Sequence, residues 1–147
     1  MSNELIISST QDGCRIALLR DKHLVEFHQE EEGSKFQVGD IYLGTVKKVV
    51  PGLNAAFIDV GYDKDAFLHY LDLGPQFSSL NKFTKLTRGK KIFGKLEKFT
   101  LEPDIDKHGK IGQQLAKGQV LPVQIVKEPI STKGPRLSCE LSLAGRY

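Results

Sequence analysis

The sequence has no tryptophan, a single methionine and only two cysteines, Cys14 and Cys139. The two cysteines lie far apart, neither belongs to a CxxC pair, and the four histidines do not complete a metal-ligand pattern. This pattern gives no support to a disulfide framework or to a Cys/His metal site. It predicts two free thiols in a reducing compartment.

Long apolar runs are missing as well. No stretch approaches the roughly 18–20 apolar residues that a helix needs to cross a membrane. The N-terminus lacks the basic-then-apolar layout of a signal peptide. We therefore expect a cytoplasmic protein without a membrane span.

An excess of charge of one sign is also missing, because 21 basic and 18 acidic residues leave a net charge of +3. So mild a balance does not by itself indicate a nucleic-acid partner, and the distribution of basic residues matters more than their total. The length of 147 residues and the hydrophobic content of 39% fit one core, with at most an appendage.

What the sequence does contain is one dense β-type stretch, Ile41–Leu71. Three strand-like runs, Ile41–Val50, Ala55–Val60 and Ala66–Leu68, are separated by Gly, Pro and Asp residues, which predicts a tightly coiled meander. Aromatic side chains beside basic residues suit stacking on bases and holding a phosphate backbone. The aromatic candidates in this stretch are Phe57, Phe67 and His69.

Strand alternation predicts which way Phe57 points. Ile58 and Val60 share one face, and Phe57 shares the other with Ala55 and Asp59. If the first face fills the interior, the Phe57 ring lies outside, where a base is a plausible partner. Packing of Phe57 in the core is the alternative.

The same parity places Phe67 and His69 on one face. His69 is suited to stacking or to donating a hydrogen bond to a phosphate. Alternatively, it is a surface histidine without a role. Lys133 and Arg136 lie on a loop that returns beside this face if a barrel closes, and both suit phosphate contact. Alternatively, these two residues only keep the turn soluble. Tyr42 and Lys47 remain weaker candidates.

The N-terminal residues Glu4–Phe27 are typical of a small antiparallel unit. Such a sheet has one thin apolar face and normally needs a second layer. It either packs on the following domain or belongs to a domain completed by sequence beyond Tyr147. A polar linker follows from Gln29 to Lys35. The expected strands, with an Asp-Gly turn after the first, are Leu5–Ile7, Arg15–Leu19 and His23–His28.

The segment Gln76–Gly118 has the weakest periodicity. We expect a short helix within Ser78–Thr87 and a loop over Leu101–Gly112, and a segment of this kind is either a functional loop or a disordered insertion. Its basic residues form a solvated face or a phosphate-attracting flank. They are Lys82, Lys85, Arg88, Lys90, Lys91, Lys95 and Lys98.

Strand character returns at Gly118–Lys127 and in the alternating run Leu137–Leu143. Pro122 predicts an edge position or a bulge in the first of these strands. Gly44 and Gly61 suit the bulges or tight bends with which a small barrel turns its corners. Together with the central stretch, these runs give five strands.

Two acidic groups invite a metal interpretation, Asp59, Asp63 and Asp65 in one place and Asp104, Asp106 and His108 in another. Asp is common in turns because it bonds to nearby backbone groups, and we therefore expect no metal site here. No nucleophile–base pair has supporting context either, so no catalytic residue is predicted.

Five strands with a long variable segment after the third resemble an OB-type barrel of the S1 kind. Motifs that carry this resemblance are Gly44-x-Val46, Phe57-Ile58, Ala66–His69 and the closing run Lys133–Ser138. Longer blocks are similar to the N-terminal part of the ribonuclease E/G family of bacterial endoribonucleases, namely the opening residues 3–19, Asn54–Gly61 and Thr132–Gly134. The resemblance covers nearly the whole chain except about residues 76–111.

The resemblance implies a mainly β fold: a five-stranded OB-fold (S1-type) barrel with an N-terminal antiparallel β-meander. Residues 1–35 would be part of an RNase H-like subdomain, and residues 36–147 an S1 domain with a long insertion at about 76–118. Single-stranded RNA would cross Phe57 and Phe67 with Lys133 nearby. The magnesium-binding aspartates, the 5′-phosphate pocket and the zinc link of the family would lie downstream, outside this chain.

The predicted function is single-stranded RNA binding by the S1 domain of a ribonuclease E/G-type endoribonuclease that acts in RNA processing and decay. The chain alone would be inert as a hydrolase and need no cofactor, whereas its parent would use Mg²⁺ and be a homo-oligomer. The alternatives are a stand-alone S1 adaptor and a protein-binding OB module without nuclease activity.

Overall fold

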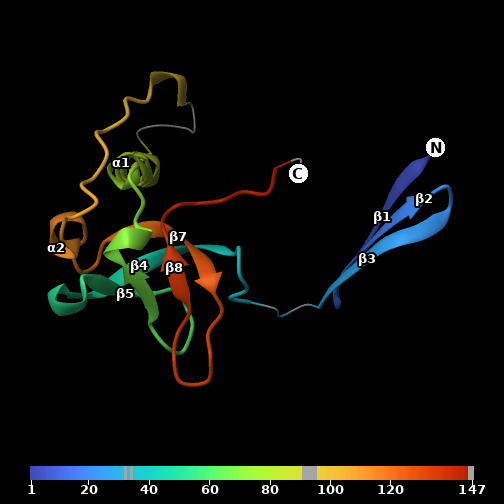
Figure 1. Cartoon of the computed structure of the whole chain (residues 1–147), viewed down its shortest axis with the longest axis horizontal. Coiled ribbons are helices and arrows are strands. Elements are labelled where there is room, and N and C mark those ends of the chain that lie inside the picture. The colour runs from blue at the N-terminus through green and yellow to red at the C-terminus, as the bar shows by residue number, and fades with distance from the viewer. Residues whose placement is uncertain (32, 34, 91–95, 146–147) are drawn as a thin grey trace. The chain divides into compact units, whose positions relative to one another are not determined.

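The computed structural model describes residues 1–31, 33, 35–90 and 96–145, and its fold is mainly β, as predicted. The chain divides into two compact units, Met1–Lys35 and Phe36–Tyr147 (Figure 1). No helix among the described residues is long and apolar enough to cross a membrane.

The first unit is a three-stranded antiparallel sheet in the order β1-β2-β3. Its strands are β1 (Asn3–Thr10), β2 (Gly13–Arg20) and β3 (His23–Glu31). Two-residue loops join them, and both residues of the second loop, Asp21 and Lys22, have positive φ, as a type I′ hairpin turn requires. The predicted meander is confirmed. The predicted start of the polar linker at Gln29 is wrong, because β3 stays paired with β2 up to Glu31.

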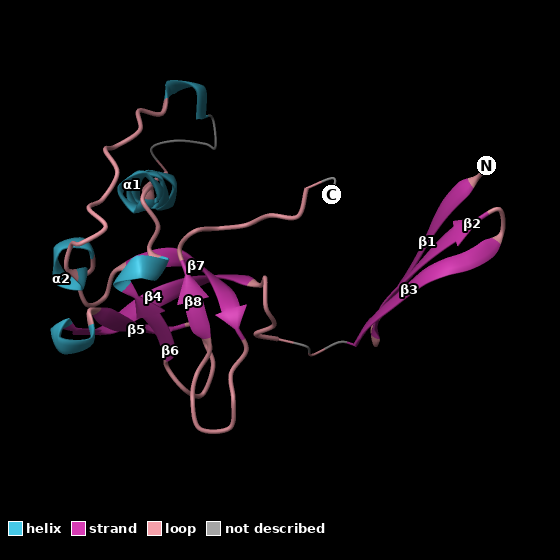
Figure 2. Ribbon diagram, viewed as in Figure 1, coloured by secondary structure: helices cyan, strands magenta, loops and turns pink. Residues whose placement is uncertain are grey.

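The second unit is built on a closed barrel with the strand order β4-β5-β6-β8-β7 (Figure 2). A short parallel pairing of β6 with β8 closes the ring, whereas every other neighbouring pair is antiparallel. The five strands that were predicted are therefore present: β4 (Ile41–Val50), β5 (Ala55–Asp59), β6 (Ala66–His69), β7 (Val120–Lys127) and β8 (Arg136–Ser138).

Alternate residues of these strands fill the barrel, among them Val46, Ile58 and Leu68, which are almost fully buried. Gly44 lies against this core, since a Cβ atom there would be 2.4 Å from Cγ2 of Ile58. Of the bulge or tight bend expected at Gly44, the bulge is wrong, because the register between β4 and β5 shifts between Val46 and Lys48.

The long segment after β6 is a folded insertion. It contains η2 (Tyr70–Asp72), α1 (Phe77–Arg88), η3 (Leu96–Lys98) and α2 (Ile111–Gln114). The predicted helix is confirmed and is one residue longer at each end. Asn54, in the left-handed conformation after η1 (Pro51–Leu53), holds the insertion, because its side chain accepts from Ile111 N at 2.7 Å and donates to Gly109 O at 3.2 Å.

The basic residues of the insertion do not form one uniform face. Lys82 already has partners within the insertion: its ammonium group donates to Thr100 O at 2.9 Å and pairs with Glu102 at 2.7 Å. Lys91 and Lys95 lie outside the described residues. The remaining members are exposed: Lys85, Arg88, Lys90 and Lys98.

The predicted last strand, Leu137–Leu143, is wrong beyond Ser138. Cys139 N donates to Asp72 O at 2.8 Å, and Ser142 N donates to the side chain of Gln124 at 2.7 Å, so this backbone is bonded to loop and side-chain groups instead of a strand. Leu141 and Leu143 are consequently exposed. The edge position predicted for Pro122 is confirmed, since β7 pairs with β8 only from Gln124 onward.

Candidate nucleic-acid interface

The outer face of β5 and β6 carries an aromatic pair. Phe57 and Phe67 are direct cross-strand partners, and their ring centroids lie 5.9 Å apart at an interplanar angle of 66°. Both rings are half-buried, whereas Ile58 and Val60 belong to the core, as strand parity predicted. Ala55, assigned by parity to the outer face, is nevertheless buried.

His69 extends the aromatic face by one ring. Its centroid lies 6.5 Å from that of Phe67, with the planes tilted by 37°. Leu71 N donates to Nδ1 of His69 at 3.1 Å, which requires the tautomer with the proton on Nε2. The bond holds the ring at the start of η2 and leaves Nε2 as a donor.

Next to this face lies an open groove of about 620 Å³, which we call the aromatic groove. One wall is the turn between β5 and β6, and the other is the turn between β7 and β8, drawn as the long lower hairpin loop in Figure 2. Its lining residues are Phe57, Lys64, Asp65, Phe67, Thr132, Lys133, Gly134 and Arg136. Four of the five predicted site residues are therefore together, and His69 adjoins them through Phe67.

The position of Lys133 follows from backbone bonds. Ile130 and Lys133 bond to each other through both backbone N–H groups, at 3.1 and 2.9 Å, which makes a tight turn. The turn is then joined to the barrel where Phe67 N donates to Pro135 O at 2.8 Å. Lys133 is exposed at the groove.

Arg136 is already engaged inside the protein. Its Nε and Nη2 atoms donate to Oδ2 of Asp72 at 3.1 and 2.9 Å. No local pattern indicates this partner, which lies 64 residues away. Arg136 therefore enters the groove with part of its charge compensated and with its Nη1 group still available.

A second ion pair lies at the same edge, where Lys47 Nζ is 2.9 Å from Oδ1 of Asp65. The hydrogen bond to Asp65 and the charge of its carboxylate raise the pKa of the Lys47 ammonium above its usual value. Lys47 is the residue at the register shift of β4, and this irregularity turns its side chain toward Asp65. Tyr42, the other weak candidate, stacks on Phe36 at 5.1 Å instead.

Sequence reasoning did not name four lining residues of the groove as site residues: Lys64, Asp65, Thr132 and Gly134. Lys64 had a usable signal, since it is a basic residue in the turn that joins the two aromatic strands. The contribution of Thr132 depends on how the β7–β8 turn folds back, which no local pattern indicates.

No group of three or more His, Cys, Asp or Glu side chains suited to a metal ion occurs in the part of the chain that the structure describes. The aspartates bond locally where the backbone turns: Asp59 accepts from Gly61 N at 2.9 Å, and Asp106 from His108 N at 2.9 Å. These residues thus do not fit a magnesium site.

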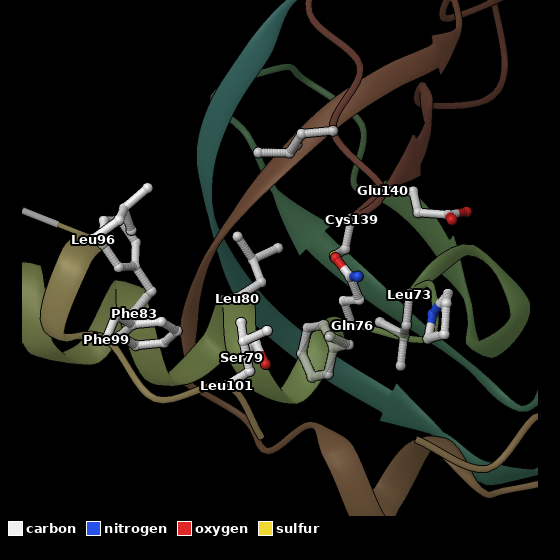
Figure 3. Close-up of a pocket in the computed structure, with 13 residues that line it drawn as sticks. Leu73, Gln76, Ser79, Leu80, Phe83, Leu96, Phe99, Leu101, Cys139 and Glu140 are labelled. Carbon is white, nitrogen blue, oxygen red and sulfur yellow. The ribbon is translucent and has the colours of Figure 1, made fainter. Parts of the chain in front are cut away.

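Another hollow, of about 530 Å³, lies between α1, the segment 96–101 and residues 139–141 (Figure 3). Its lining is mostly apolar, and the rings of Phe83 and Phe99 meet edge to face at 5.6 Å. Cys139 is buried there, and burial raises the pKa of its thiol to about 12, so it is a poor nucleophile. This hollow offers packing surface rather than chemistry.

The closed barrel and its aromatic groove define an S1 RNA-binding domain. The chain belongs to the S1 RNA binding domain family, whose match spans residues 35–140. Comparison with individual proteins narrows the family further. The chain is 37% identical over all 147 residues to ribonuclease G of Escherichia coli strain K12, of which it covers 26%.

Two further relatives are also ribonucleases. Ribonuclease G of Haemophilus influenzae is 33% identical over 144 residues, which are 98% of this chain and 26% of that protein. Ribonuclease E of a Nostoc species is 38% identical over 112 residues, 76% of this chain and 12% of that protein. The chain spans about a quarter or less of the length of these relatives. The predicted S1 fold and the resemblance to the ribonuclease E/G family are confirmed.

Proposed function

We propose that the barrel binds single-stranded RNA in the aromatic groove, with Phe57 and Phe67 stacking on bases and Lys133 at the backbone phosphates. The observation that carries the proposal is the ring pair, 5.9 Å apart on the outer face and beside a groove rimmed with basic side chains. Half-buried rings leave apolar area in water, and a base covers that area.

His69 and Arg136 serve at the margins of this site. His69 stacks on a base or donates a hydrogen bond from Nε2 to a phosphate. The bond from Leu71 N holds the ring in place for either role. Arg136 keeps its bond to Asp72 and offers Nη1 to a phosphate.

A titration of single-stranded RNA tests the proposal. The paired change Phe57→Ala and Phe67→Ala should weaken binding by about 30-fold or more, since each stacked base contributes about 1–3 kcal/mol. The matched control is Phe83→Ala with Phe99→Ala, because that pair also meets edge to face, at 5.6 Å, but lies on the insertion. Unchanged affinity in the first variant would refute stacking and favour a protein-binding barrel.

We also propose that this domain serves a ribonuclease E/G-type endoribonuclease that acts in RNA processing and decay. Similarity along the entire chain to ribonuclease G supports this reading. In that protein the sheet β1–β3 would be part of an RNase H-like subdomain, and hydrolysis would use Mg²⁺ on carboxylates outside this chain. The parent would be a cytoplasmic homo-oligomer.

The parent enzyme has its own test. A protein that continues beyond Tyr147 should cleave RNA only with Mg²⁺, and light scattering should give a mass of more than one chain. Metal-independent binding without any cleavage would support a stand-alone adaptor instead.

A further inference from the structure

Three cationic side chains line the aromatic groove and a fourth, Lys47, bonds to the lining residue Asp65; two of these four are paired. Lys47 binds Asp65 and Arg136 binds Asp72, each at 2.9 Å. The other two, Lys64 and Lys133, line the groove, and neither forms an ion pair with any residue that the structure describes. Unpaired ammonium groups bind phosphate without first breaking an internal bond. Lys64 thus offers its full charge to a phosphate, whereas Asp72 compensates part of the charge of Arg136.

Lys64 and Lys133 belong to different turns, and these turns touch at Gly134. A Cβ atom on Gly134 would lie 2.2 Å from Asp65 O and 2.9 Å from Lys64 O. Both atoms belong to the backbone, so no side-chain rotation relieves the clash. Only glycine therefore permits the β7–β8 turn to approach the β5–β6 turn this closely.

The approach at Gly134 fixes how the two lysines stand relative to the rings. Pro135, the next residue, is fully buried and accepts the hydrogen bond from Phe67 N at 2.8 Å. The turn carrying Lys133 is thus attached directly to a strand of the aromatic pair, while Lys64 precedes the start of the same strand by two residues. Both basic turns therefore line the same groove as Phe67.

We infer that Lys64 is a further RNA-contact residue and that Gly134 is a positioning residue that sets Lys64 and Lys133 as a two-turn clamp on the RNA backbone. The inference rests on the proposed function. Its ligand is the phosphodiester of the nucleotides that stack on Phe57 and Phe67. The clamp binds charge and not base identity, so it adds affinity without sequence preference.

The test is a salt series of RNA titrations. Lys64→Ala and Lys133→Ala should each reduce the log–log salt slope by about 0.7, the contribution of one phosphate on a single strand. Lys85→Ala is the control, because Lys85 is an exposed lysine on α1 and should leave the slope unchanged. Equal slopes for wild type and Lys64→Ala would overturn the assignment, as would a change for Lys85→Ala alone.

Gly134→Ala tests the positioning role. It should weaken binding and lower the slope in the wild-type background, yet add no further loss to the double variant Lys64→Ala/Lys133→Ala. Gly112→Ala, with open space around its Cβ position, is the matched glycine control. A full additional loss in the double variant would contradict the clamp. If Gly134→Ala fails to fold, the slope of Lys64→Ala decides the inference.

The two proposals fail in different ways. If Phe57→Ala/Phe67→Ala loses affinity while the lysine variants keep the wild-type slope, only the clamp is wrong. If the aromatic variant binds like wild type, the proposed function itself is wrong.

Discussion

At the scale of single residues, Gly44 shows how closely the barrel is packed. A Cβ atom there would lie 2.4 Å from Ile58 Cγ2 and 3.3 Å from Val123 Cγ2, both in the core. We expect Gly44→Ala to destabilise the fold by about 1–3 kcal/mol, the usual cost of overpacking. Urea unfolding measures this, with Gly52→Ala, which meets nothing within 4 Å, as the control. Equal stability of the two variants would contradict the account.

The buried thiol of Cys139 makes stability depend on alkaline pH. Burial, aided by the charge of Asp72, raises the thiol pKa from 9.0 to about 12. Below pH 9 the thiol is neutral in both states. Between pH 9 and about 12 the unfolded chain ionises first, so stability falls as pH rises. The free energy of unfolding of wild type should thus drop more steeply above pH 9 than that of Cys139→Ala, and parallel curves would refute this.

Strand alternation was sufficient to separate Phe57 from Ile58 and Phe67 from Leu68, because alternation is a local property, but it left open which face fills the core. Alternation could not predict the ion pair of Arg136, because its partner Asp72 lies 64 residues away. Nor could it predict the position of Lys64 in the groove, which depends on two turns meeting at Gly134. Such pairings arise from barrel closure, which a local pattern does not contain.

At the scale of elements, the side chain of Asn54 joins the start of α2 to the end of β4 and η1. Asn54 accepts from Ile111 N at 2.7 Å and donates to Gly109 O at 3.2 Å. Asn54→Ala should cost about 1–3 kcal/mol, since it leaves these partly buried groups unpaired. Asn54→Asp keeps the acceptor for Ile111 and should cost less.

Hydrogen exchange reports where that loss occurs. In Asn54→Ala, amide protection should fall at Ile111 and Leu115 more than in β7, because only α2 loses its anchor. Uniform loss across the barrel would mean that Asn54 supports the fold generally and does not act as a local anchor.

The elements also show why some sequence predictions held. α1 was expected inside the segment of weakest periodicity and is present, whereas the alternating residues of Leu137–Leu143 indicated a strand that ends at Ser138. Backbone groups beyond that point bond to Asp72 and Gln124, which are distant in sequence. Tertiary bonding overrode the local pattern there.

At the scale of the whole molecule, the barrel has a complete core of its own. Every residue of the buried cluster lies at or after Val46, and the barrel is closed without β1–β3. Removing residues 1–35 should therefore leave the melting temperature of the barrel and its RNA affinity nearly unchanged. Loss of either property would show that the barrel depends on the first unit.

The first unit has no such core. Its sheet leaves large apolar side chains exposed, among them Leu5, Ile7, Leu24 and Phe27. Amides of β1–β3 should accordingly exchange faster than those of β4–β8. Equal protection in the two units would contradict this expectation.

The most direct test of the central claim is an NMR titration of the chain with a short single-stranded RNA. The ring resonances of Phe57 and Phe67 should shift upfield, together with amide shifts at Lys64 and Lys133, because stacked bases impose ring currents at those sites. Shifts confined to α1, with the two rings unmoved, would contradict it.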